Sequence, residues 1–205
     1  MIYILDSGYA GKHQILYFDT AGKTDNVGHG TDTVDLVRLY NRRVEICLIS
    51  SEANKSTAKL HKLFARLRAI VTVNDILLIP WVIIEDTNID NDINELAALC
   101  HVICAAGNNS DSVDYYSPAR ATNAITVGCL NKSGAPAKLS NHPTLAKPLE
   151  YMYGTNIQID ENRTVTGTSA SAAIYAALFQ RSLQFKNRTK FMEKATAQLK
   201  KQLTR

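Results

Sequence analysis

The sequence predicts an α/β fold in three layers, with a mostly parallel sheet and helices on both of its faces. Segments rich in apolar and β-branched residues alternate along the chain with segments whose apolar residues recur at helical spacing. This alternation favours right-handed strand–helix–strand crossovers, which build a parallel sheet. No repeat, low-complexity tract or break in composition divides the chain, so residues 1–205 are expected to form a single domain.

The predicted strands are short and mostly apolar. In chain order they occupy residues 2–5, 14–18, 44–49, 75–84, 102–106 and 124–129. Asp6 closes the first of them, and Asn108 lies just beyond the strand at 102–106. Because catalytic groups gather at the carboxyl ends of strands in such sheets, we expect a functional site at this edge.

Helices are predicted between the strands. One begins near His29 and ends at about Tyr40, a second follows Ser56, whose side chain can cap it, and a third occupies residues 91–99. The second carries its apolar residues at helical spacing, at Leu60, Leu63, Phe64 and Leu67. Each helix therefore has one face to lay on the sheet.

Residues 186–205 are predicted to form a basic C-terminal helix. Its apolar residues recur at every fourth position, at Phe191, Ala195, Leu199 and Leu203, and Glu193 is its one acidic residue among many Lys and Arg. Two interpretations stay open: a solvated cationic helix packed on its own domain, or a surface for an acidic protein partner. A nucleic-acid partner is not expected.

The composition excludes several classes of protein. With 45% apolar and 20% charged residues the chain is globular, and its apolar runs end well before the roughly 18 residues that a membrane span needs. The start of the chain lacks the features of a secretory signal, so a cytoplasmic location is expected. The four cysteines, Cys47, Cys100, Cys104 and Cys129, lie in apolar segments and are predicted to be buried free thiols. Neither a metal nor a cofactor is expected.

Four short motifs stand at the boundaries of predicted elements. They are Asp6-Ser7-Gly8, Gly28-His29-Gly30-Thr31, Ala105-Ala106-Gly107-Asn108 and Gly167-Thr168-Ser169-Ala170. Taken singly, each is compatible with an ordinary turn or helix entry. Together they supply a nucleophile, a base, an acid that orients the base and an amide donor for an oxyanion, which are the groups that a hydrolase needs.

In this order the motifs resemble those of the subtilisin family (subtilases, peptidase S8). Further resemblances lie at Ser117-Pro118-Ala119, at residues 124–128 and at Leu139-Ser140-Asn141. The resemblance implies a three-layer subtilisin-like fold and a serine endopeptidase acting on polypeptides. Because the chain begins almost at Asp6, a compact member without a prosegment is expected. It assigns Asp6, His29 and Ser169 as the catalytic triad and Asn108 as an oxyanion donor.

The chain departs from the family pattern in two places. Ala173 replaces a proline after the serine, a change that a helix tolerates. Pro80-Trp81-Val82-Ile83 stands where the family has a glycine-containing wall of the specificity pocket. We therefore expect a shallow pocket for a small P1 side chain. Narrow specificity is expected as well, because a cytoplasmic protease without a prosegment would endanger its host. The predicted substrate-binding residues are Pro80, Trp81, Val82, Ala106, Gly107 and Tyr116.

Two other functions compete with this one. Nucleotide binding fails on spacing, since the glycines of Gly8-Tyr9-Ala10-Gly11-Lys12 are too close together for a phosphate-binding loop and no hydroxyl follows the lysine. A subtilisin-like scaffold with little catalytic activity, serving as a binding or assembly module, remains the alternative to a protease.

Overall fold

The computed structural model describes residues 1–51 and 56–203. Its centre is a seven-stranded sheet in the order β2-β3-β1-β4-β6-β8-β9, and every neighbouring pair is parallel. The strands are β1 (Ile2–Asp6), β2 (Leu16–Tyr17), β3 (Ile46–Ser50), β4 (Ile76–Ile79), β6 (His101–Ala105), β8 (Ile125–Leu130) and β9 (Glu150–Tyr153). The predicted α/β class with a parallel sheet is confirmed.

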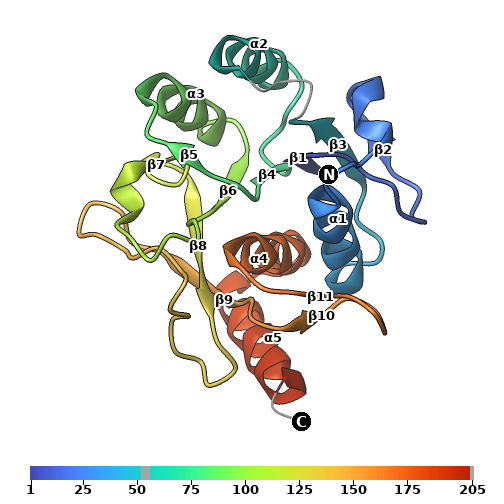
Figure 1. Ribbon diagram of the computed structural model, residues 1–205, viewed down its shortest axis with the longest axis vertical. Coiled ribbons are helices and arrows are strands. Elements are labelled where there is room, and N and C mark those ends of the chain that lie inside the picture. Colours follow the sequence, from blue (N-terminus) through green and yellow to red (C-terminus); the bar gives the residue numbers. More distant parts are fainter. Residues whose placement is uncertain (52–55, 204–205) are drawn as a thin grey trace.

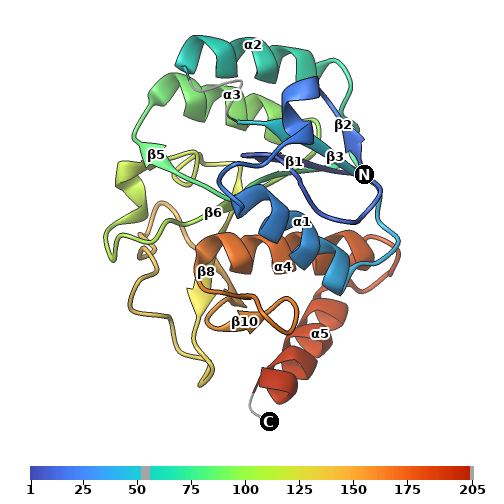
Figure 2. The same cartoon turned by 45° about the vertical axis from the view of Figure 1, so that its right-hand side comes forward.

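Helices cover both faces of this sheet (Figures 1 and 2). They are α1 (His29–Tyr40), α2 (Thr57–Arg68), α3 (Thr87–Ala97), α4 (Thr168–Ser182) and α5 (Arg188–Leu203). Side chains alternate along β1, so that Ile2 and Ile4 pack on the side of α1 and α4, whereas Tyr3 and Leu5 pack on the side of α2 and α3. Burial on both faces explains why the central strands are almost wholly apolar.

Shorter elements connect the layers. Two are 3₁₀ turns, η1 (Thr20–Lys23) and η3 (Val113–Tyr115). β5 (Ile83–Ile84) pairs antiparallel with β7 (Tyr116–Ser117), and β10 (Ile157–Gln158) pairs antiparallel with β11 (Thr164–Val165). The β10–β11 hairpin leads directly into α4.

The predicted strand at 75–84 is wrong in its second half. Regular pairing in the main sheet ends at Ile79, and Pro80, which has no N–H to donate to a ladder, follows. Ile83 and Ile84 lie outside the main sheet, and Ile84 is 79% exposed. After its first residue the run is apolar, although its last residues lie on the surface.

Helix boundaries follow the capping side chains. α1 has the predicted bounds, and Ser56 caps α2 by accepting a hydrogen bond from the N–H of Lys59. α3 begins earlier than the predicted 91–99, because the Asp86 carboxylate accepts from the N–H groups of Asn88 and Ile89 and so fixes the first turn there.

The basic C-terminal helix forms as α5, with Leu199 buried among the residues of α4 and the sheet. Thr204 and Arg205, which the sequence placed at its end, lie outside the described residues. The Arg181 guanidinium lies over the ring of Phe191, which stacks on Phe185. None of the helices in residues 1–51 and 56–203 has both the length and the apolar character needed to cross a membrane.

All four cysteines are buried and unpaired. Burial raises the pKa of Cys47 and of Cys100 to about 11, and that of Cys104 to about 12. Burial also raises the pKa of Cys129. These groups are therefore neutral thiols at physiological pH, as expected for residues that fill the core.

Lys147 is a buried cation that closes the loop before β8. Only 4% of the residue is exposed, and its Nζ donates to the carbonyls of Ala121 and Ala124, each at 2.6 Å. Burial lowers the pKa of this lysine, and the nearby Asp90 carboxylate acts in the opposite direction. The ammonium group thus satisfies two backbone acceptors in a place that water does not reach.

Replacing Lys147 with methionine should lower the free energy of unfolding by about 1–3 kcal/mol, because two buried carbonyls lose a donor while the side-chain volume is nearly kept. Urea denaturation of the wild type and the variant measures the loss. Lys132→Met, at an exposed position, is the matched control and should stay within about 0.5 kcal/mol of the wild type. Equal stability of all three proteins would contradict the bridging role of Lys147.

Candidate active site

Asp6 and His29 form a hydrogen-bonded pair at the carboxyl end of β1. His29 Nδ1 lies 2.8 Å from Asp6 Oδ1 and 3.0 Å from Oδ2. Asp6 is the last residue of β1 and its side chain is 3% exposed, whereas the His29 side chain, at the first position of α1, is 40% exposed. The pair therefore joins a buried carboxylate to an imidazole that reaches the surface.

Two more donors hold the Asp6 carboxylate. The N–H of Ser7 donates to Oδ1 at 2.7 Å, and the Thr33 hydroxyl, one turn after His29 in α1, donates to Oδ2 at 2.8 Å. Since an ionised carboxylate only accepts, Nδ1 of His29 carries the proton and Nε2 is left with a free lone pair. The arrangement fixes both the tautomer and the direction of the ring.

The pKa of His29 is raised above its ordinary value. Burial acts against the charged imidazolium, but the hydrogen bond that His29 donates to Asp6 and the charges of Asp6, Asp32 and Asp25 together outweigh it. His29 is thus a stronger base than a free imidazole, because three carboxylates face it.

Ser169 lies in the first turn of α4, where Asn108 meets the start of the helix. Asn108 Oδ1 accepts from the N–H of Thr168 at 2.9 Å and from the Thr168 hydroxyl at 3.0 Å. These bonds turn Nδ2 of Asn108 away from Thr168. Gly167 is required here, because it has φ +149° and a Cβ on it would lie 3.1 Å from Asn108 Nδ2.

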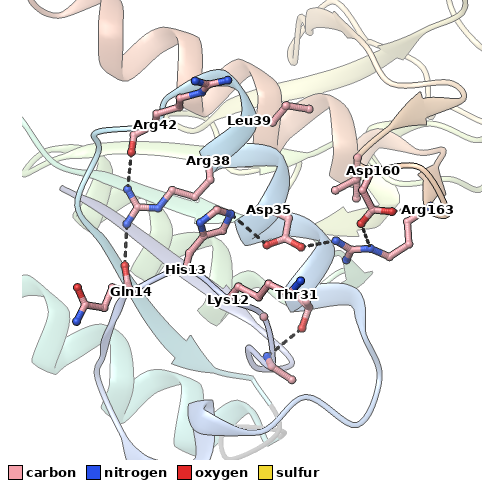
Figure 3. Close-up of a pocket in the computed structure, with 13 residues that line it drawn as sticks. Lys12, His13, Gln14, Thr31, Asp35, Arg38, Leu39, Arg42, Asp160 and Arg163 are labelled. Atoms are coloured by element: carbon pink, nitrogen blue, oxygen red, sulfur yellow. Dashed lines mark hydrogen bonds and ion pairs between the residues drawn. The ribbon is translucent and has the colours of Figure 1, made fainter.

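His29, Asn108 and Ser169 line one cavity of about 280 Å³. The other lining residues are Pro80, Trp81, Val82, Ala105, Gly107, Asn109 and Thr168. In the part of the chain that the structure describes, no hydrogen bond joins His29 to Ser169. A larger cavity, of about 890 Å³, lies along α1 (Figure 3), but none of these three residues lines it, so its size does not make it the candidate site.

The predicted substrate-binding residues divide between the cavity wall and other places. Pro80, Trp81, Val82 and Gly107 line the cavity, and a Cβ on Gly107 would lie 3.2 Å from Cγ2 of Val82, so the two residues face each other closely. The other two predicted residues, Ala106 and Tyr116, do not line the cavity. Ala106 is fully buried and its carbonyl accepts from Asn141 Nδ2, while Tyr116 lies in β7.

A hydrogen bond to the backbone of β1 holds the Trp81 side chain in place. Its Nε1–H donates to the Leu5 carbonyl at 2.7 Å, which ties the cavity wall to β1. Ala173, the other departure from the family pattern, lies fully buried within α4, and the helix continues through it as expected.

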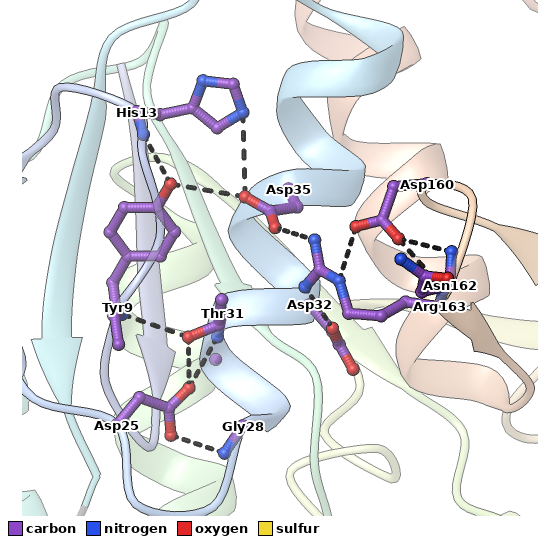
Figure 4. A network of polar contacts seen from close by, with 12 residues as sticks. Tyr9, His13, Asp25, Gly28, Thr31, Asp32, Asp35, Asp160, Asn162 and Arg163 are labelled. Carbon is purple, nitrogen blue, oxygen red and sulfur yellow. Dashed lines mark hydrogen bonds and ion pairs between the residues drawn. The ribbon is translucent and has the colours of Figure 1, made fainter.

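Sequence reasoning missed Asp25, which holds the start of α1, the helix that carries His29 (Figure 4). Its carboxylate accepts from the N–H groups of Gly28 and Thr31, both at 2.8 Å, and from the hydroxyls of Thr31 and Ser7. Asp25 thereby satisfies free N–H groups at the start of α1. The spacing to Thr31 is not that of a standard capping box, so the sequence offered no recognisable signal.

Metal ligands do not gather at the candidate site. Among residues 1–51 and 56–203, no group of three or more His, Cys, Asp or Glu side chains is arranged to hold a metal ion. The chemistry that these residues can perform by themselves is proton transfer between Ser169 and His29, and hydrogen bonding from the amide of Asn108.

Comparisons with known proteins show which family the chain resembles. A model of the subtilase family (Peptidase_S8) matches residues 7–204. The chain is 31% identical over 90 residues to a putative subtilisin-like proteinase 2 of Encephalitozoon cuniculi, and 36% identical over 81 residues to a cuticle-degrading serine protease of Orbilia oligospora. These matches cover 44% and 38% of this chain, but only 16% and 19% of the two relatives.

Solved structures share the fold over most of the chain. A cold-adapted subtilisin-like serine proteinase superposes with a TM-score of 0.77 at 20% identity, covering 93% of this chain and 78% of the other. The prenylagaramide maturation protease PagA superposes with a TM-score of 0.72 at 18% identity, covering 89% and 74%.

An NMR titration of the His29 imidazole should find its midpoint above the ordinary value of 6.5. Because folding raises this pKa, the stability that the pair contributes is complete below 6.5 and is lost as pH rises through the folded-state pKa. Asp6→Asn should lower the midpoint, since burial then acts without the carboxylate. Glu161→Gln, an exposed control, should leave it unchanged. The same titration midpoint in the wild type and in Asp6→Asn would show that the Asp6–His29 pair does not form.

Proposed function

The chain belongs to the subtilase family, and from this premise we propose that it is a serine endopeptidase with Asp6, His29 and Ser169 as its catalytic triad. One observation carries the proposal: a base oriented by a buried carboxylate shares a small cavity with a serine at a helix start and with an amide donor. This is the set of groups that acyl transfer needs.

The proposed reaction begins with Ser169 Oγ, which attacks the carbonyl carbon of the scissile peptide bond. His29 Nε2 accepts the hydroxyl proton as the new C–O bond forms. When the tetrahedral intermediate collapses, the C–N bond breaks and His29 returns the proton to the leaving amine. Water then hydrolyses the acyl-enzyme by the same route. Asp6 stays ionised and stabilises the imidazolium.

The oxyanion would be stabilised from two directions. Asn108 Nδ2 is turned away from Thr168 by the two bonds that Oδ1 accepts. The N–H of Ser169 belongs to the first turn of α4, where backbone N–H groups lack an intrahelical acceptor and carry the positive end of the helix dipole. Both donors are available when the carbonyl oxygen becomes negative.

The cavity supports a preference for small P1 side chains. At about 280 Å³ it is small, and the side chain of Val82 closes the space beside Gly107. The bond from Trp81 to the backbone of β1 keeps this wall from moving aside. A large aromatic P1 side chain would therefore meet Val82 and Trp81.

A fluorophosphonate probe, which reacts with activated serines, should label the purified protein and should fail to label Ser169→Ala. Ser133→Ala, at an exposed serine that does not line the cavity, is the control and should label like the wild type. A folded wild-type protein that resists the probe would contradict the proposal and favour the alternative of a binding scaffold with little activity.

Val82→Gly should widen the specificity. Removing the Val82 side chain opens the space beside Gly107, so the kcat/KM for peptides with phenylalanine at P1 should rise about tenfold relative to peptides with alanine. A peptide library cleaved by both proteins measures the change. Ile84→Gly makes a similar change nearby on an exposed residue and should keep the native profile. A native preference for large aromatic or basic P1 residues would overturn the assignment of this wall.

A further inference from the structure

The cavity along α1 is lined by polar side chains, several of which already have partners. It lies between residues 10–14, α1 and the loop of the β10–β11 hairpin (Figure 3). The Arg38 guanidinium donates to the carbonyls of Gln14, Arg42 and Val44. The Asp35 carboxylate contacts Arg163 and His13. Apart from Arg38 Nε, which has no partner among the described residues, these inner groups are hydrogen-bonded or ion-paired, so the cavity suggests a brace between elements rather than a site waiting for a ligand.

Arg163 is the centre of this brace (Figure 4). Its Nη1 lies 2.9 Å from Asp32 Oδ1 and its Nη2 lies 2.6 Å from Asp35 Oδ2, so it forms ion pairs with two successive turns of α1. Its Nε lies 2.7 Å from Asp160 Oδ2. Each nitrogen of the planar guanidinium is therefore committed to a carboxylate.

Asp160 fixes the hairpin side of the brace. Its Oδ1 accepts from the N–H groups of Asn162 and Arg163, both at 3.0 Å. These bonds hold the turn of the β10–β11 hairpin, so the guanidinium leaves the hairpin in a defined direction. The ion pairs with α1 thus join two structured elements.

The two joined elements carry the proposed base and the proposed nucleophile. α1 begins with His29, one turn before Asp32. The hairpin strand β11 follows Arg163 directly and runs through Gly167 into α4, where Ser169 lies. A shift of the hairpin relative to α1 would therefore change the separation of the His29 ring from the Ser169 hydroxyl.

Arg163 also affects the charge around His29. The carboxylates that face His29 come from β1, from the loop before α1 and from α1 itself, as Asp6, Asp25 and Asp32. Arg163 compensates the charge of Asp32 through its ion pair. Without the guanidinium, Asp32 would favour the imidazolium more strongly.

We propose that Arg163 is a positioning residue, which sets the distance between the His29 helix and the Ser169 segment and balances the charge of Asp32 beside the imidazole. The role depends on geometry as well as charge, since lysine can present one ammonium group but cannot bond three carboxylates in one plane. The proposal rests on the proposed protease function for its kinetic consequence, but its electrostatic consequence holds for the folded protein alone.

The test compares Arg163→Gln and Arg163→Lys with the wild type, with Arg42→Gln as the matched control. Arg42 lines the same cavity and is exposed, and among the described residues its guanidinium has no hydrogen-bond or ion-pair partner. Two quantities are measured on each protein: the His29 pKa by NMR, and kcat and KM separately on a peptide substrate.

Arg163→Gln should raise the His29 pKa and lower kcat about tenfold with little change in KM, since Arg163 does not line the cavity that contains Ser169. Arg163→Lys should keep the pKa nearer to that of the wild type and still lose kcat. Arg42→Gln should change neither quantity. A wild-type pKa and kcat in a folded Arg163→Gln protein would overturn the proposal.

Asp32→Asn provides a second test, and its own effect on the His29 pKa can be measured without Arg163→Gln. Removing this carboxylate should lower the His29 pKa, and adding Arg163→Gln to it should then raise the pKa less than in the wild type. Equal effects in both backgrounds would refute coupling through Asp32. A protein without peptidase activity would refute the proposed function, whereas an unmoved His29 pKa would refute the role of Arg163, so the two failures are distinguishable.

Discussion

The structure of the site depends on burying the Asp6 carboxylate without leaving its charge unsatisfied. A buried charge is costly unless hydrogen bonds replace those of water. The donors come from Ser7, Thr33 and His29, of which two lie on α1. α1 must therefore start against the end of β1, so closely that a Cβ on Gly30 would lie 2.2 Å from the carbonyl oxygen of Gly8. The orientation of the imidazole follows from this one requirement.

A similar polar junction forms at the start of α4. Asn108, beyond the end of β6, accepts two hydrogen bonds from Thr168. Gly167, which precedes Thr168, allows the close approach. The parallel sheet brings the two junctions to one edge, because β1 and β6 end on the same side with β4 between them. Arg163 links the helix of the first junction to the hairpin that leads to the second. Parts of the chain that are far apart in sequence are thus held together by the parallel sheet and by the ion pairs of Arg163.

The features that could be predicted from the sequence are those set by residues close together in the chain. Strands β1, β3, β6 and β8 are apolar runs between polar residues, and α1 starts where its motif indicated. The sequence failed where one local residue outweighed the pattern, as Pro80 did by ending β4 and Asp86 by starting α3 early. Asp25 and Arg163 could not be found, since their roles arise from contacts made only after folding. Arg163 meets Asp32 across 131 positions of sequence, and no local pattern encodes such a pair.

The burial of all four cysteines has a consequence for handling this protein. Alkylating reagents and oxidants attack the thiolate, and burial keeps these sulfurs protonated as well as enclosed. Modification must then wait until the surrounding sheet opens. The rate at which the native cysteines are alkylated, followed by mass spectrometry, therefore reports how often the interior opens, and no cysteine has to be introduced for the measurement.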